Sequence, residues 1–232
     1  MASDKTWKSQ ELLNFCPKYA TNNAAVYVAS VGSKIDRILF LVERFTFVED
    51  LTLRLGSVQF IKTQLEVEIY VESVASNLHS LADVFAQVIN EIVLKPLLPE
   101  TEHFSREKVD LNKIKTKLVG LTLEPVKKRY IDEIINNINN LSNSVEFLYV
   151  SGFVNTIKHQ RLLNTTFYLI VAPGNLIDVG FKLNAFDHKG SHFPEMSCRN
   201  FVIDYRKNLI DYISDIGISV NNYCKVNHIQ NV

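Results

Sequence analysis

The feature that most constrains the fold is a long apolar segment that stops at Lys95-Pro96. Between Ile69 and Val93, apolar residues recur at helical spacing and cover most of the circumference of a helix expected over residues 58–94. The helix should end at Pro96, because proline has no amide hydrogen and disfavours helix in the residue before it. A helix that is apolar on several faces must be covered by other helices. The segment therefore predicts a mainly α-helical bundle with this helix at its centre.

The remaining segments divide into further helices and one β-hairpin. We expect helices over residues 22–45, 109–119 and 199–224, and a helix from Pro125 toward Gly152 that continues through His159 to Leu163. Residues 1–20 read as an extended lead-in, residues 47–56 as a connection, and Gly217 as a candidate helix break. Residues 165–171 are β-branched and aromatic, residues 173–175 have turn chemistry and residues 177–186 alternate again, which predicts a hairpin before the last helix.

These elements suggest a single domain over residues 1–232. Its helical body would comprise about 22–164 and 199–225, and the hairpin with a following polar loop would occupy about 165–195.

Composition gives this chain few functional hints. Its 25 Lys and Arg balance its 25 Asp and Glu, so no global charge attracts nucleic acid or an anionic membrane. Three cysteines without a close pair suggest a reducing cytoplasm. No apolar run approaches the ~20 residues of a membrane span, and the first residues do not resemble a signal peptide. The abundance of Asn, Ile and Lys is typical of AT-rich bacterial genomes.

A polar stripe interrupts the central helix. It recurs at steps of three or four residues: Glu68, Glu72, Ser76, His79, Asp83, Gln87 and Asn90. The spacing of His79 and Asp83 would let a carboxylate hold an imidazole, or let both bind one metal ion. The chain lacks the paired Glu-x-x-His motifs of di-metal helical bundles. We therefore favour a structural hydrogen-bond network, expect no metal and no cofactor, and keep a single metal site as the weaker alternative.

A second cluster places Asn155, Lys158, His159 and Arg161 within two helical turns. An imidazole that titrates near neutral pH beside two cations could perform acid–base chemistry or bind an anion. The structural alternative is a helix C-terminal turn whose cations complement the helix dipole. We expect His79 and Asp83 to face this segment, because a buried carboxylate or imidazole needs a polar partner.

The stretch Asn155-Thr156-Ile157-Lys158-His159 resembles the motif of the HEPN helical-bundle superfamily. Ribonuclease members carry an arginine, a polar residue, three variable residues and a histidine near the start of a helix. The polar residue and the histidine correspond to Asn155 and His159, but Val154 stands at the arginine position. The resemblance implies an RNA- or nucleotide-binding protein of a bacterial defence or toxin–antitoxin system. The valine implies a member that binds rather than cuts.

Two other polar segments favour a structural interpretation. Asp187, His188, His192 and Glu195 could be a zinc set, but Gly190 and Pro194 oppose the helix that would present both histidines, so we expect a solvated loop. The lysines near residues 113–117 and 127–129 read as solvated helix faces. No phosphate-binding loop, dinucleotide fingerprint or nucleophile elbow is present.

Two functional classes are compatible with these observations. The first is a non-enzymatic helical module that binds a partner or forms a homodimer. The second is the HEPN-like ribonuclease or nucleotide-binding protein, for which His159, Lys158 and Asn155 are the candidate catalytic residues. We expect Asn155, Lys158, His159, Arg161, His79 and Asp83 to line any ligand site.

Overall fold

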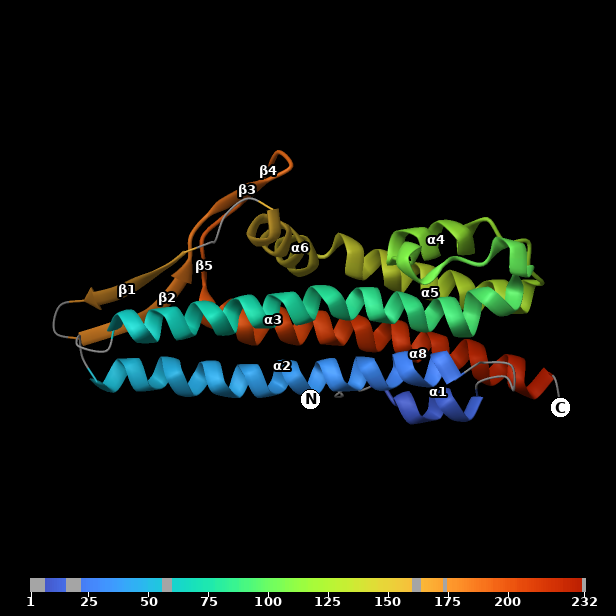
Figure 1. Cartoon of the computed structure of the whole chain (residues 1–232), viewed down its shortest axis with the longest axis horizontal. Helices are drawn as coiled ribbons and strands as arrows, with labels where there is room; N and C mark the ends of the chain where they lie inside the picture. The colour runs from blue at the N-terminus through green and yellow to red at the C-terminus, as the bar shows by residue number, and fades with distance from the viewer. Residues whose placement is uncertain (1–6, 16–21, 56–59, 160–163, 173–174, 231–232) are drawn as a thin grey trace. The chain divides into compact units, whose positions relative to one another are not determined.

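The computed structural model describes residues 7–15, 22–55, 60–159, 164–172 and 175–230 (Figure 1). It is mainly α-helical, with a small antiparallel sheet before the C-terminal helix, which confirms the expected fold class. The chain forms two compact units: unit 1 comprises residues 1–35, 80–144 and 209–232, and unit 2 comprises residues 36–79 and 145–208. Helices α2 (Asn22–Leu55), α3 (Phe60–Ile89) and α8 (Arg206–Gln230) each contribute residues to both units. Among the described residues, no helix combines the length and apolar character of a membrane span.

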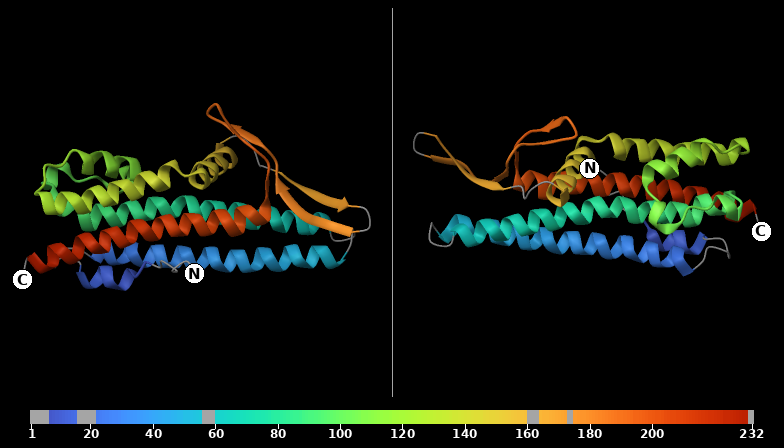
Figure 2. Two further views of the ribbon diagram at one scale, coloured as in Figure 1. Left: turned by 180° about the vertical axis from the view of Figure 1, so that it is seen from behind. Right: turned by 45° about the horizontal axis from the view of Figure 1, so that its top comes forward.

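Unit 1 is built from helices and short helical turns. Besides parts of α2, α3 and α8, it contains α1 (Ser9–Phe15), a π-helical turn (Asn90–Leu94), three 3₁₀ turns (Lys95–Leu97, Glu100–Glu102 and Arg106–Lys108), α4 (Leu111–Val119) and α5 (Pro125–Asn143). Helix α4 begins at Leu111 because the Asp110 side chain accepts a hydrogen bond from the Lys113 amide at 2.8 Å. It lies beside α5 (Figures 1 and 2). Buried isoleucines and leucines on one face of each helix form the core.

The lead-in prediction is wrong for residues 7–15. Trp7 is 8% exposed, its indole packs edge-on against Phe85 with ring centroids 5.0 Å apart, and Leu12 of α1 is fully buried. The Trp7 indole nitrogen donates to the Asn221 side-chain oxygen at 3.1 Å. Gly217 does not break α8; it leaves room for the Trp7 ring, which a Cβ at that position would overlap.

Several helix boundaries also differ from the prediction. The central helix α3 ends at Ile89 and not at residue 94, because a π-helical turn, Asn90–Leu94, follows it. Helix α2 continues through residues 47–55, because no glycine or proline interrupts it before Gly56 and Val48 and Glu49 still face the core. The single helix expected from Pro125 is instead two helices, α5 and α6 (Val145–His159). Ser144 adopts an extended backbone between them, and its hydroxyl donates to the Leu141 carbonyl at 2.9 Å.

Unit 2 carries the sheet. Strands β1 (Thr165–Ala172) and β2 (Asn175–Leu183) form the predicted antiparallel hairpin, with Thr165 opposite Leu183, and β5 (Met196–Ser197) pairs with β2 (Figures 1 and 2). The expected polar loop after β2 contains a second hairpin, β3 (Phe186–His188) and β4 (Ser191–Phe193). Lys189 and Gly190 make its turn with positive φ angles of 49° and 79°. Helix α7 (Cys198–Asn200) and a π-helical turn (Phe201–Tyr205) lead into α8.

An aromatic cluster forms the core of unit 2 around Tyr149. The Tyr149 ring contacts Phe186, Phe193 and Phe201 at centroid distances of 5.3 to 5.9 Å, and its hydroxyl donates to the Pro194 carbonyl at 3.3 Å. The pairs with Phe186 and Phe193 are edge-to-face, an arrangement that adds to the free energy gained by burial. The cluster ties the small hairpin β3–β4 to α6 and to the π-helical turn before α8.

Candidate functional site

The cluster selected from the sequence forms the last turns of α6. The side-chain Nδ2 of Asn155 donates to the Ser151 carbonyl at 2.8 Å, so this side chain forms a hydrogen bond within its own helix. Lys158 and His159 are exposed in the last turn, where a cation interacts favourably with the negative end of the helix dipole. Arg161 lies outside the described residues. The described part of the cluster thus presents a lysine and an imidazole to solvent.

Val154, the residue at the arginine position of the resembled motif, faces the core. Val154 and Thr156 are both fully buried in unit 2. Within the described part of the chain, the Thr156 hydroxyl has no hydrogen-bond partner. Position 154 therefore presents an apolar side chain to the core and no charge to a phosphate.

His79 lies beside the other end of α6. Its ring stacks on Phe147 with centroids 6.4 Å apart and an interplanar angle of 5°. Asn155 is eight residues further along α6, which is about 12 Å along the helix axis. The stacking contact therefore places the imidazole near the first turn of α6, away from Lys158 and His159. Asp83, one turn after His79 in α3, is exposed and belongs to unit 1.

The C-terminal end of the polar stripe holds a loop of unit 1. Gln87 donates to the Arg106 carbonyl at 2.8 Å, and Asn90 is buried in the π-helical turn. The His103 ring nitrogen lies 3.0 Å and 3.1 Å from the carbonyls of Lys95 and Leu98, which follow that turn. These contacts satisfy backbone groups at a helix end that proline terminates. Gln87 thus helps to hold the loop, whereas the side-chain oxygens of Gln87 and Asn90 have no hydrogen-bond partner among the described residues.

The histidines of the second hairpin do not converge on a metal site. Asp187 and His192 are cross-strand neighbours, and a carboxylate oxygen lies 2.8 Å from the imidazole Nδ1. Both side chains are exposed, so the pair contributes little to stability. Across residues 7–15, 22–55, 60–159, 164–172 and 175–230, no group of three or more His, Cys, Asp or Glu could hold a metal ion.

An ion pair between a buried carboxylate and an exposed arginine lies in unit 2 and was not predicted from the sequence. Glu49 of α2 is 2% exposed, and its carboxylate accepts from Arg199 Nε at 2.8 Å. The same guanidinium donates to Asp50 at 2.8 Å. Although partial burial alone would lower it, the pKa of Arg199 is raised because these two carboxylates favour its charged form. The only sequence signal was a carboxylate on the buried face of an otherwise apolar helical segment.

A neighbouring network ties α3 to the start of β1. The Glu68 carboxylate accepts from the amide and the hydroxyl of Thr165, both at 3.0 Å. Gln64 donates to the Thr165 carbonyl at 2.9 Å. Glu68 and Gln64 thus form hydrogen bonds with the backbone amide and carbonyl of Thr165, the first residue of β1. Glu68 of the polar stripe therefore has a structural role.

Two potential nucleophiles of unit 2 are held in their protonated forms. Burial raises the pKa of the Cys198 thiol, and the nearby carboxylates of Glu49 and Glu68 raise it further. Burial, followed by the neighbouring Tyr205 and Cys198, also raises the pKa of Tyr149. A thiol reacts as its thiolate, so Cys198 is suited to packing and not to nucleophilic catalysis.

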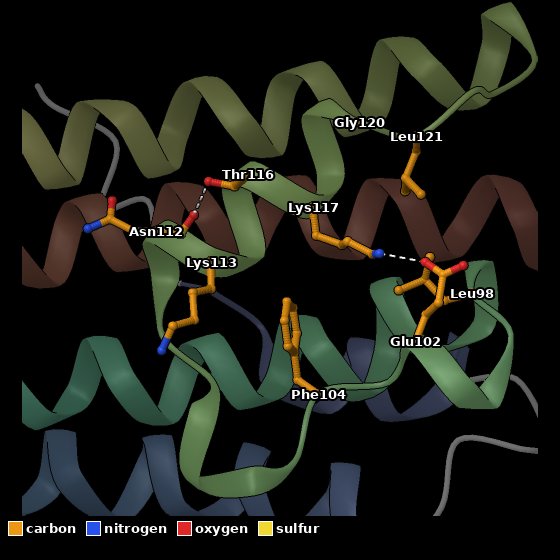
Figure 3. Close-up of a pocket in the computed structure, with 9 residues that line it drawn as sticks. All are labelled: Leu98, Glu102, Phe104, Asn112, Lys113, Thr116, Lys117, Gly120 and Leu121. Atoms are coloured by element: carbon orange, nitrogen blue, oxygen red, sulfur yellow. Dashed lines mark hydrogen bonds and ion pairs between the residues drawn. The ribbon is translucent and has the colours of Figure 1, made fainter.

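A groove of about 510 Å³ lies on unit 1 between the loop after α3 and α4 (Figure 3). Leu98, Phe104 and Leu121 supply its apolar walls. Lys117 reaches across to Glu102, at 2.5 Å, and Lys113 pairs with Asp110 at 2.9 Å. The groove is therefore flanked by cations that are already neutralised, and it lacks the converging polar groups that orient a small-molecule substrate.

Exposed apolar side chains are unevenly distributed between the units. Twelve large ones are exposed among the described residues, and nine of them belong to unit 2. They lie on α2, α3, α6 and β1: Leu39, Phe40, Phe47, Leu65, Ile69, Val145, Leu148, Leu169 and Ile170. The three of unit 1 are Val26, Val119 and Val126. Isolated apolar residues are normal on a protein surface, and it is their larger number on unit 2 that favours an interaction surface there.

Comparisons of the chain with protein-family models, with curated proteins and with solved structures gave no match.

Proposed function

We propose that the protein is a non-enzymatic binding module that associates with a protein surface through unit 2. The observation that carries this proposal is the accumulation of nine exposed large apolar side chains on that unit. Covering such side chains provides the main driving force of protein association. Two of them are phenylalanines, and aromatic residues are enriched in interfaces.

The chemistry of the described polar residues supports binding over catalysis. The charged side chains with close partners form structural ion pairs, such as Arg199 with Glu49 and Lys117 with Glu102. The thiol of Cys198 is buried and protonated. A catalytic site needs a nucleophile or base held within hydrogen-bond reach of a second functional group in a cleft. The exposed His159 and Lys158 do not lie in the groove of unit 1.

A HEPN-like ribonuclease or nucleotide-binding protein is the second candidate. The observation that favours it is the exposure of Lys158 and His159 at the end of α6, where both could reach a phosphate. Burial of Val154 at the arginine position argues for binding without cleavage.

Site-specific photo-crosslinking in living cells tests the binding proposal. A benzophenone amino acid would replace Phe47, Leu65 or Leu148 of unit 2, and the control positions Val119 and Val126 of unit 1, which are similarly exposed. We expect protein adducts from the unit 2 positions and few from the controls. Equal yields from both sets, or no protein adducts from unit 2, would overturn the proposal.

A further inference from the structure

The part of α2 that belongs to unit 2 turns one side to the core and the other side to solvent. Ile38 and Phe45 are fully buried, whereas Phe40 and Phe47 are 60% and 57% exposed. An α-helix turns about 100° per residue, so Phe40 and Phe47 lie within about 20° of each other around the helix and nearly opposite the two buried residues. The outer side of this segment therefore presents two phenylalanines along one line.

The charges beside this line are separated by sign. Asp36 and Glu43 lie about 40° and 60° to one side of Phe40, and they form the acidic flank. Arg37 and Arg44 lie about 60° and 40° to the other side, and they form the basic flank. All four side chains are exposed. An apolar line with an acidic and a basic flank results.

The two flanks do not neutralise each other within the helix. Ion pairs on a helix join residues three or four positions apart, and no acid of one flank has that spacing from an arginine of the other. Among the described residues, Asp36, Arg37 and Glu43 form no ion pair and no side-chain hydrogen bond. The Arg44 guanidinium lies 5.5 Å from the centroid of the Phe47 ring. Both flanks can therefore meet the charges of a partner.

A second copy with α2 parallel complements this surface. A twofold axis that runs parallel to the two helices, between their phenylalanine lines, places the acidic flank of each copy opposite the basic flank of the other. Asp36 then faces the partner's Arg37, and Glu43 faces the partner's Arg44. Each pair occurs twice, and its members differ by only about 1.5 Å in height along the helices. Opposite charges thus meet on both sides of the apolar line.

The antiparallel arrangement lacks this match. Its twofold axis is perpendicular to the helices and keeps both acidic flanks on one side of the contact, so that acid faces acid and arginine faces arginine. Like charges that face each other across an interface oppose association. The separation of charge on α2 therefore favours a second copy of the chain in the parallel direction.

We propose that two copies of the chain associate in parallel through Phe40, Phe47 and the two charged flanks of α2. This inference rests on the proposed function, because it names the partner of one part of the unit 2 surface. From Asp36 to Phe47 the helix is only about 16 Å long. The contact is at the small end of specific interfaces, so the dimer is reversible, with a dissociation constant on the order of 10 µM.

Sedimentation velocity of the full chain between about 1 and 500 µM tests the association. The wild type should shift from monomer to dimer over this range, and salt should weaken the dimer because exposed ion pairs are screened. Phe40→Asp should raise the dissociation constant by about tenfold or more, because it places two carboxylates together on the axis. Val126→Asp, at a similarly exposed site of unit 1, should leave it unchanged. A wild type that remains monomeric at the highest concentration would overturn the inference.

A charge exchange tests the pairing itself. Asp36→Arg alone and Arg37→Asp alone should each raise the dissociation constant about tenfold, because each places like charges together twice in the dimer. The double variant Asp36→Arg/Arg37→Asp restores both pairs, so its dissociation constant should lie within about threefold of the wild-type value. Failure of this rescue would overturn the proposed pairing. Both side chains are exposed, so the fold should tolerate each change, as circular dichroism would verify.

Oxidative cross-linking reports the direction of the helices. In the parallel pair, residues 40 and 47 each meet their own equivalents near the axis, so Phe40→Cys and Phe47→Cys should both form disulfide-linked dimers. An antiparallel pair could join only one of these positions, because the other pair would then be about 21 Å apart along the helices. The wild type is the control for the native cysteines, of which Cys198 and Cys224 are buried.

Cross-linking at only one position, or at neither, would refute the parallel pair. If the wild type is monomeric while unit 2 positions still cross-link to another protein, the dimer fails and the proposed binding function stands.

Discussion

The effect of Gly217→Ala on the free energy of unfolding should depend on Trp7. It should be destabilising when Trp7 is present and stabilising when Trp7 is removed. Trp7 lies against α8 so closely that a Cβ at Gly217 would be 2.6 Å from two carbons of the indole, in addition to overlapping a third. Gly217→Ala should therefore destabilise the wild type. In a Trp7→Ala background the obstacle is gone, and the same substitution should stabilise the protein, because alanine favours helix more than glycine does.

The expected magnitudes follow from the packing. Adding a methyl group to a filled core costs about 1–3 kcal/mol. Replacing glycine by alanine inside an unobstructed helix gains up to about 1 kcal/mol. The two backgrounds should thus differ by about 1–4 kcal/mol in the effect of Gly217→Ala, and this difference is the coupling free energy. Trp7→Ala by itself should cost about 3–5 kcal/mol, because the side chain is almost completely buried.

Urea unfolding followed by far-ultraviolet circular dichroism measures the free energy of unfolding of the wild type, the two single variants and the double variant. Trp7 is the only tryptophan in the chain, so its fluorescence additionally reports the unfolding of its own surroundings in variants that retain it. Gly32→Ala is the matched control: it lies in a helix with no atom within 4 Å of the added Cβ, so it should be neutral or stabilising in both backgrounds. If Gly217→Ala has the same effect with and without Trp7, the close packing of the N-terminal segment is refuted.

Three further predictions concern unit 2. Gly152→Ala should lower the free energy of unfolding by about 1–3 kcal/mol, because its Cβ would lie 2.8 Å from the Phe193 ring, and Phe193→Leu should recover part of the loss in thermal unfolding experiments. Burial, and then the nearby Glu68, raise the pKa of Glu72 above its ordinary value of 4.5, so the folded state binds this proton more tightly and loses stability as the pH rises through the raised pKa. Glu72→Gln should therefore stabilise the protein at pH 7 by a few tenths of a kcal/mol and make no such difference below pH 4, since the side chain is only partly buried. Under the ribonuclease hypothesis, His159→Ala should abolish RNA cleavage without changing the circular dichroism spectrum, and a wild type that never cleaves RNA would remove that hypothesis.

The sequence shows the type and spacing of the candidate site residues, but it does not show the environment of their side chains. The spacing of Asn155 and His159 on α6 follows from helix geometry. Whether each side chain is exposed, buried or engaged depends on what packs against the helix. Asn155 donates a hydrogen bond to a carbonyl of its own helix, and His79 stacks on Phe147. Lys158 and His159 are exposed to solvent. No local pattern distinguishes these outcomes.

The contacts missed in the sequence join residues that are far apart in the chain. Trp7 bonds to Asn221, 214 residues away, and this contact turns an apparent lead-in into part of the core. Glu49 pairs with Arg199, 150 residues away, and this pairing makes a buried carboxylate tolerable. The break at Ser144 carried no proline or glycine, so helical periodicity ran through it without a signal.

Local patterns in the sequence were sufficient to predict the mainly α class, the end of regular α-helix before Pro96 and the hairpin before the last helix. Each of these depends on periodicity, proline geometry or turn chemistry, which act over a few neighbouring residues. Which polar groups are paired in the core, and which apolar side chains remain uncovered, depends on packing between segments that are distant in the chain. Burial is a property of the surroundings that distant segments create, and the uneven exposure of unit 2, on which the proposed function rests, is therefore not visible in any local stretch of sequence.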